Sequence, residues 1–181
     1  MALLILAHPN FEKSLANKAI VEELITSDIN VEIRNIASLY PDYNIDAKIE
    51  QEFILKHKNI IFQYPIYWYN MPAILKQWFD VVLEYGFAYG STGDKLKGKN
   101  FIPSFTVGAP EKDYKALGEH HFKVHEFCKN IEQTAYYTQM NYIDPIYFHD
   151  TSVNSGFTKE EIILKAKHQA KNLIEFLKSI E

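Results

Sequence analysis

Short apolar runs alternate with longer amphipathic segments along this chain. The short runs predict strands at residues 2–7, 30–35, 59–64, 100–107 and 142–148. Most of them are apolar at nearly every position, which is typical of strands buried on both faces of a parallel sheet. In the second run Val31 and Ile33 alternate with charged residues, as expected for a strand with only one covered face. We therefore expect five strands, the second of which is half covered.

Helical periodicity predicts a helix after each strand. The first helix has apolar positions at Leu15, Ala16, Ala19, Ile20 and Leu24, and the third at Ile74, Leu75, Trp78, Phe79 and Val82. Pro72 precedes the third helix, where its fixed φ suits a helix start. The other helices are expected at 46–57, 121–138 and 159–179. This alternation predicts an α/β fold: one flavodoxin-like, three-layer domain over residues 1–181, with a five-stranded parallel sheet in the order 2-1-3-4-5 and helices on both faces.

Composition and charge exclude several classes of protein. The chain has 181 residues, 47% of them apolar, which is enough for one folded core and argues against disorder. Its 19 basic and 23 acidic residues form no basic block, so a nucleic-acid partner is not expected. The single cysteine, Cys128, permits no intrachain disulfide and no cysteine-based zinc site. No run approaches the roughly 20 apolar residues of a membrane span, and the start lacks the basic leader of a signal peptide, so we expect a cytoplasmic protein.

The loop after the first strand is a candidate anion site. It ends at a helix start, where free N–H groups and the positive end of the helix dipole favour a phosphate. His8, Ser14 and Asn17 add side-chain donors, and a bound phosphate would favour protonated His8. The alternative is structural: Ser14 caps the helix and His8 is an ordinary loop residue. This loop alone leaves both interpretations open.

Aromatic residues dominate the loop after the third strand. Tyr67, Trp68 and Tyr69 lie between two prolines, Pro65 and Pro72. They cannot all pack inward from a loop, so some are expected to face a flat ligand or a partner chain. A dimer surface without any ligand is the alternative.

The loop after the fourth strand holds small residues and then two side chains that can carry protons. Gly108 and Ala109 let the backbone approach a ligand closely. Downstream, Tyr114 and His120 are able to donate and relay protons at a reaction centre. Either residue is more often structural when it occurs alone.

Several motifs together resemble those of the flavodoxin-like NAD(P)H:quinone oxidoreductases, in particular their short bacterial branch, which includes ancillary subunits of potassium-efflux systems. The similar segments are 7–9 with Ser14 and Asn17, 39–44, 65–72, 75–80, 86–90 and 106–109. The resemblance implies non-covalently bound FMN, with NAD(P)H as co-substrate. We expect FMN and not FAD, because the chain ends directly after its last amphipathic helix. The implied phosphate-binding residues are His8, Ser14, Leu15, Ala16 and Asn17, and the implied ring-binding residues are Pro65, Ile66, Tyr67, Trp68, Tyr69, Thr106, Val107, Gly108 and Ala109.

The resemblance also implies a mechanism. In the family's two-electron quinone reductases a tyrosine and a histidine six residues later stabilise the reduced flavin, and Tyr114 and His120 match this pair. The implied reaction is a ping-pong hydride transfer from NAD(P)H, by way of flavin N5, to a quinone-like acceptor. We expect a homodimer, because the aromatic loops around Trp68 and residues 86–90 present more apolar surface than a monomer of this size normally leaves in water. The resemblance implies that the flavin lies at this interface, with the Tyr89 region facing the partner's flavin. Trp68 and Tyr89 are expected to contact the substrate, and no metal is expected. Val107 and Ala109 depart from the Thr and Gly often found in the family, which changes the hydrogen bonds available to the flavin.

Three other interpretations compete with this one, and a fourth is compatible with it. Residues 93–99 look like the start of a P-loop, but Asn100 stands where Ser or Thr must hold Mg²⁺, and a strand follows instead of a helix. His121, His125 and Cys128 have a helical spacing that could hold a metal, although no fourth ligand is evident. A flavodoxin-type one-electron carrier is disfavoured, since its phosphate loop is usually rich in Ser and Thr. An ancillary role at a potassium-efflux transporter, on the inner face of the membrane, is compatible with the enzyme.

Overall fold

The strands form one parallel sheet, and their order determines where the candidate loops lie. The computed structural model describes residues 1–180. Its strands are β1 (Ala2–Leu6), β2 (Val31–Asn35), β3 (Asn59–Pro65), β4 (Asn100–Thr106), β5 (Asn141–Tyr142) and β6 (Ile146–Phe148). They pair in parallel in the order β2-β1-β3-β4-β5, and β6 pairs with β4 farther along the same edge. The predicted α/β class and strand order are confirmed.

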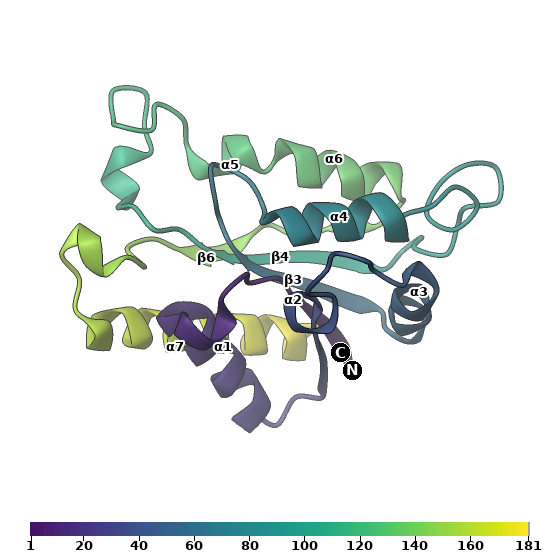
Figure 1. The fold of residues 1–181 in the computed structure, drawn as a ribbon, viewed down its shortest axis with the longest axis horizontal. Helices are drawn as coiled ribbons and strands as arrows, with labels where there is room; N and C mark the ends of the chain where they lie inside the picture. Colours follow the sequence, from purple (N-terminus) through teal and green to yellow (C-terminus); the bar gives the residue numbers. More distant parts are fainter. Residues whose placement is uncertain (181) are drawn as a thin grey trace.

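Helices cover both faces of the sheet (Figure 1). One face carries α1 (Leu15–Thr26) and α7 (Lys159–Ser179), and the other carries α3 (Ala47–Lys56), α4 (Ala73–Val82), α5 (Val124–Phe127) and α6 (Lys129–Tyr137). Successive side chains of a strand point to opposite faces. Leu4 and Leu6 therefore pack with α1 and α7, whereas Leu3 and Ile5 pack with the layer of α4. Every residue of β1, β3 and β4 is buried, while those of β2 are half-buried, as its alternating sequence predicts.

Capping side chains fix the ends of the long helices. Asp46 accepts hydrogen bonds from the N–H groups of Lys48 and Ile49 at the start of α3. Thr158 and Glu161 form a capping box at the start of α7. The predicted helices at 46–57 and 159–179 are thereby confirmed to within a residue at each end. Among the helices of residues 1–180, none is both long and apolar enough to cross a membrane.

The predicted fifth strand and fourth helix are each divided in two. The strand expected at 142–148 appears as β5 and β6, separated around Pro145, which has no N–H for the strand ladder. The helix expected at 121–138 begins only at α5, because Glu126 accepts a hydrogen bond from the N–H of Lys123 at 2.7 Å and fixes the start there. His121 has a φ of 59°, which no right-handed helix permits.

Four short helical turns were not predicted. One is α2 (Ile36–Leu39), which directly follows β2 and buries Ile36. The other three are 3₁₀ turns in the loops, at Phe11–Lys13, Glu111–Asp113 and Val153–Ser155. Turns of three or four residues are too short for apolar periodicity to reveal them.

Candidate functional site

The loops that follow β1, β3, β4 and β6 gather at the end of the sheet remote from the chain's N-terminus (Figure 1). They enclose a cavity of about 400 Å³. Its lining comprises His8, Asn10, Lys13, Ser14, Leu15, Ala16, Asn17, Pro65, Tyr67, Thr106, Thr151, Ser152 and Val153. All five predicted phosphate-binding residues are in this set. The cavity lies at the carboxyl ends of the strands, where doubly wound sheets bind ligands.

The start of α1 supplies the donors of this cavity. Ser14 accepts a hydrogen bond from the N–H of Asn17 at 3.1 Å and so caps the helix. The first N–H groups of a helix have no partner within it, and Leu15 and Ala16 carry two of these groups into the cavity lining. Lys13 adds a positive charge beside them. Both interpretations of Ser14 are therefore compatible, since a capped helix start is also an anion-binding element.

His8 is arranged as a neutral donor. Its Nδ1 accepts a hydrogen bond from the N–H of Asn10 at 3.0 Å, so the single proton of the neutral ring is on Nε2. Burial of the ring lowers the pKa of His8 from its ordinary value of 6.5. The backbone hydrogen bond of His8 acts in the opposite direction and offsets part of this effect. His8 thus presents an N–H group to the cavity near pH 7.

A chain of side-chain hydrogen bonds orients Asn17 from beneath the cavity. Asn17 Nδ2 donates to Thr106 Oγ1 (3.1 Å), and Asn17 Oδ1 accepts from Gln63 Nε2 (2.8 Å). Gln63 Oε1 in turn accepts from Ser104 Oγ (2.7 Å), whose oxygen accepts from Gln169 Nε2 (2.9 Å). All five residues are buried. Because each donor meets an acceptor, the amide of Asn17 is held in one orientation.

The aromatic loop after β3 forms a tight hairpin turn with unusual backbone angles. Tyr67 and Asn70 exchange two backbone hydrogen bonds, of 2.9 and 3.1 Å. Between them, Trp68 and Tyr69 have φ angles of 47° and 65°, a pairing that usually takes Asn and Gly. The Trp68 side chain is 91% exposed. A bulky side chain at positive φ on an exposed turn is a feature that structures retain mainly at functional sites.

The turn after β4 leaves two backbone donors available. Across residues 1–180 the N–H groups of Gly108 and Ala109 have no hydrogen-bond partner. A Cβ atom built on Gly108 meets nothing within 4 Å, so the space beside this residue is open. Ile66 is joined to the same turn, because its N–H donates to the carbonyl of Thr106 at 2.9 Å. The structure thus brings the predicted ring-binding segments 65–69 and 106–109 together.

Tyr114 and His120 also meet beside this turn. Their rings stack with centroids 4.2 Å apart, and His120 Nδ1 lies 3.3 Å from the hydroxyl of Tyr69. His120 Nε2 is buried without a hydrogen-bond partner among residues 1–180. Burial, and secondarily the nearby Tyr69, raises the pKa of Tyr114, so its hydroxyl stays protonated at neutral pH. The pair predicted from the sequence therefore joins the aromatic hairpin through Tyr69.

Tyr89 lies away from this cluster in the single chain. It precedes β4 and packs against Tyr85 and Tyr137, with ring centroids 5.8 and 5.5 Å away. It belongs to the opposite end of the sheet from Trp68. Any contact between Tyr89 and a substrate at this site thus requires a second copy of the chain.

The alternative metal site has no structural support in the part of the chain described. No group of three or more His, Cys, Asp or Glu side chains there could hold a metal ion. The helical face that would join His121, His125 and Cys128 is absent, because His121 precedes the helix. Burial raises the pKa of Cys128 to about 11, which makes its thiol a poor ligand and nucleophile.

A family model described as a flavodoxin-like fold matches residues 1–174. The chain belongs to this flavodoxin-like family. YrkL of Bacillus subtilis, described as an uncharacterized NAD(P)H oxidoreductase, is 36% identical over 177 residues, or 98% of this chain and 97% of that protein. KefF of an Enterobacter species, described as a glutathione-regulated potassium-efflux system ancillary protein, is 36% identical over 97% of both chains. The resemblance found in the sequence is confirmed.

One solved structure is similar to this chain over nearly the whole length of both proteins. General stress protein 14 of Treponema denticola, in complex with FMN, matches with a TM-score of 0.89 and 34% identity. The match covers 99% of both chains.

One part of the candidate site was missed from the sequence. Thr151, Ser152 and Val153 line the cavity from the loop after β6, and His149 contacts the turn after β4. Apart from Tyr89, the residues predicted from the sequence all lie in or near the loops after the first, third and fourth strands. The general rule that ligands bind beyond the carboxyl ends of the strands applies to the fifth strand as well, and could have included this loop.

Proposed function

We propose that this chain is an FMN-dependent NAD(P)H oxidoreductase that passes two electrons to a quinone-like acceptor in a ping-pong order. The observation that carries the proposal is the junction of two features: a cavity lined by a helix start, and a turn with two unpartnered N–H groups beside an open space at Gly108. The first suits a phosphate and the second suits the polar edge of a flat ring. FMN contains both groups, and the similar Treponema protein is described in complex with it.

The residues of this chain have separate tasks in that proposal. Leu15, Ala16 and His8 would hold the phosphate through their N–H groups, with Asn17 held in place beside them. When bound, FMN supplies a ring that accepts a hydride from NAD(P)H and releases two electrons to a second substrate. Tyr114 and His120 would provide O–H and N–H donors where negative charge develops, and such donors stabilise the charged state more than the neutral one.

A substitution at Gly108 tests the cofactor site directly. Gly108→Val adds a side chain where the present structure has open space, at a residue whose φ is not in the left-handed region. We expect the variant to fold as well as the wild type and to lose FMN, because the added methyl groups occupy the space beside the two free N–H groups. Gly156→Val would not serve as a control, since Gly156 has a φ of 90°; Leu117→Val, at a fully exposed position, does.

The identity of the flavin is a separate measurement. Heating the purified protein and chromatographing the released flavin distinguishes FMN from FAD. FAD in near-stoichiometric amount would contradict the proposal.

The proposed roles of Tyr114 and His120 predict a kinetic effect. Removing both groups in Tyr114→Phe with His120→Ala should slow flavin reduction by NAD(P)H by about 10–1000-fold, by analogy with lost oxyanion donors. Stopped-flow bleaching of the flavin measures this step, and flavin content should stay unchanged. His121→Ala, at the adjacent exposed histidine, is the matched control. Reduction of the double variant at the wild-type rate would assign both residues a structural role.

A homodimer belongs to the same proposal. Trp68, Tyr85 and Tyr137 are 91%, 67% and 63% exposed, which is more aromatic surface than a monomer of this size usually leaves in water. A two-fold dimer would cover this surface and bring Tyr89 of one copy toward Trp68 of the other. Light scattering should give twice the chain mass of 21.1 kDa. A 21.1 kDa particle across micromolar concentrations would rule the dimer out.

A second role is supported by the similarity to KefF, whose description places it in a potassium-efflux system. We propose that the enzyme also acts as an ancillary subunit at the inner face of the membrane. Potassium efflux from cells with and without the gene tests this, and the Tyr114→Phe/His120→Ala variant shows whether turnover is needed. Equal efflux with and without the gene would reject the role.

A further inference from the structure

The loop after β6 holds the turn after β4 by three side-chain or backbone donors. Thr151 directs both its N–H (3.2 Å) and its Oγ1 (3.1 Å) to the carbonyl of Val107. His149 directs Nδ1 to the carbonyl of Ala109 at 3.0 Å. A carbonyl can only accept, so Nδ1 of His149 carries a hydrogen. The carbonyl of Phe148 completes the attachment by accepting from the N–H of Val107 at 3.0 Å.

These bonds determine where the free N–H groups of the turn point. The carbonyl of Val107 and the N–H of Gly108 belong to one planar trans peptide, so they point in opposite directions. With its carbonyl fixed by Thr151, this peptide aims the N–H of Gly108 away from the loop. The next peptide, which carries the N–H of Ala109, lies between the two fixed carbonyls of Val107 and Ala109. Both unpartnered N–H groups are thus oriented by residues that do not themselves belong to the turn.

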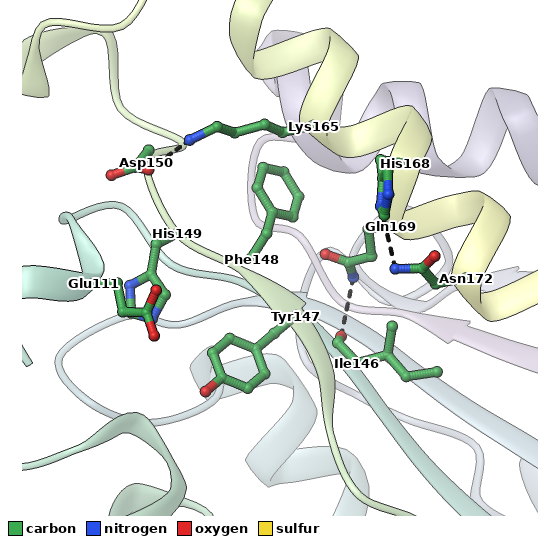
Figure 2. Close-up of a pocket in the computed structure, with 10 residues that line it drawn as sticks. All are labelled: Glu111, Ile146, Tyr147, Phe148, His149, Asp150, Lys165, His168, Gln169 and Asn172. Carbon is green, nitrogen blue, oxygen red and sulfur yellow. Dashed lines mark hydrogen bonds and ion pairs between the residues drawn. The ribbon is translucent and has the colours of Figure 1, made fainter.

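His149 also contacts the candidate catalytic pair. Its ring lies 5.2 Å from that of Tyr114, which stacks on His120. A second pocket, of about 440 Å³, is lined by His149 together with Glu111 and His168. Figure 2 shows His149 at the end of β6, at one side of this pocket. His168 lies on α7 across this pocket and bonds to Asn172 instead of the turn.

We propose that Thr151 and His149 are positioning residues, which aim the N–H groups of Gly108 and Ala109 at the polar edge of the flavin ring. The inference rests on the proposed FMN site. Backbone donors stabilise developing negative charge best when they are already oriented, since a donor that must reorient loses part of its effect. Releasing the turn should therefore weaken FMN binding. It should also lower the midpoint potential of the bound flavin, because the reduced, more negative form loses more than the oxidised form.

Paired variants separate positioning from packing. Thr151→Val keeps the shape of the side chain and removes the hydroxyl, whereas Thr151→Ser keeps the hydroxyl. His149→Leu removes the ring donor, whereas His149→Asn retains an N–H near the position of Nδ1. One lost hydrogen bond should raise the Kd for FMN by about 3–10-fold in Thr151→Val and in His149→Leu. The potential should fall in the same two variants, and the Ser and Asn variants should restore both quantities. His168→Leu is the control in the same pocket and should change neither.

The measurements are fluorescence titration of the apoprotein with FMN and a redox titration of the holoprotein. Wild-type protein that fails to bind FMN would overturn the proposed function itself. Wild-type protein that binds FMN, with Thr151→Val and His149→Leu unchanged in Kd and potential, would overturn only the positioning role. Loss of binding that Ser and Asn do not restore would also overturn it, because it would reveal a requirement for packing alone.

Discussion

Trp68→Asn should stabilise the single chain while impairing the function of the protein. Trp68 and Tyr69 occupy the two central positions of a tight turn with φ angles of 47° and 65°. A non-glycine residue held at positive φ costs on the order of 1–3 kcal/mol, and Asn tolerates this region because its short side chain bonds locally. Only 9% of the surface of Trp68 is covered, because the residue is 91% exposed. That coverage corresponds to about 20 Å² and so to about 0.5 kcal/mol of burial.

The balance favours the variant by about 1 kcal/mol, which should raise the melting temperature by about 2–4 °C for a domain of this size. Thermal unfolding followed by circular dichroism at pH 7 measures this shift in dilute apoprotein that light scattering shows to be monomeric, because the proposed dimer would cover Trp68. Trp68→Phe is the matched control: it keeps a bulky ring at positive φ and should leave the melting temperature unchanged. A melting temperature for Trp68→Asn at or below the wild-type value would refute the account of strain. Under the proposed function, the same variant should lower the turnover of NAD(P)H and quinone, because Trp68 is one of the residues expected to contact the substrate.

Three further predictions test the core, the cysteine and the anion site. Glu50→Gln should lower the free energy of unfolding in urea by about 3–5 kcal/mol. The buried carboxylate accepts from Arg34 Nε at 2.8 Å and Trp78 Nε1 at 3.0 Å, and the substitution leaves the Arg34 guanidinium without its counter-charge. Glu12→Gln, in an exposed pair with Lys18, should cost less than about 1 kcal/mol. Cys128, with its pKa raised to about 11, should react with Ellman's reagent at pH 8 far more slowly in the native protein than in urea, and equal rates would contradict its burial. Burial lowers the pKa of His8, so on acidification the unfolded chain binds a proton at this residue before the folded chain does. The stability that His8 contributes is therefore lost as the pH falls below about 6.5. NMR titration of His8 should show that low pKa in the apoprotein and a higher one with FMN, since a phosphate favours the imidazolium; an unchanged value with FMN bound would place the phosphate elsewhere.

Elements whose sequence pattern extends over many residues were predicted accurately, and short or interrupted elements were not. Buried strands and amphipathic helices carry their signal over many residues, as in residues 59–64 and 159–179, and both were predicted closely. The fifth strand was placed correctly but not its interruption. Pro145 lies inside the predicted strand. Whether a proline interrupts a strand depends on whether its missing N–H would have faced a neighbouring strand.

In the candidate site, the sequence does not show which residues orient the hydrogen-bonding groups. Ser14, Asn17, Tyr114 and His120 could be named because each belongs to a motif with local spacing. The partners that orient the hydrogen-bonding groups of the site are remote in sequence: Gln63 is 46 residues from Asn17, and His149 is 40 residues from Ala109. Neither partner has a local motif, and a glutamine in a strand or a histidine after one has many structural roles. Since a free N–H group is useful only when its peptide is fixed, the residues that fix it form as much of the site as those that carry it. The residues that fix the peptides can be identified only from the structure, in which the register of β3, β4 and β6 brings them next to their partners.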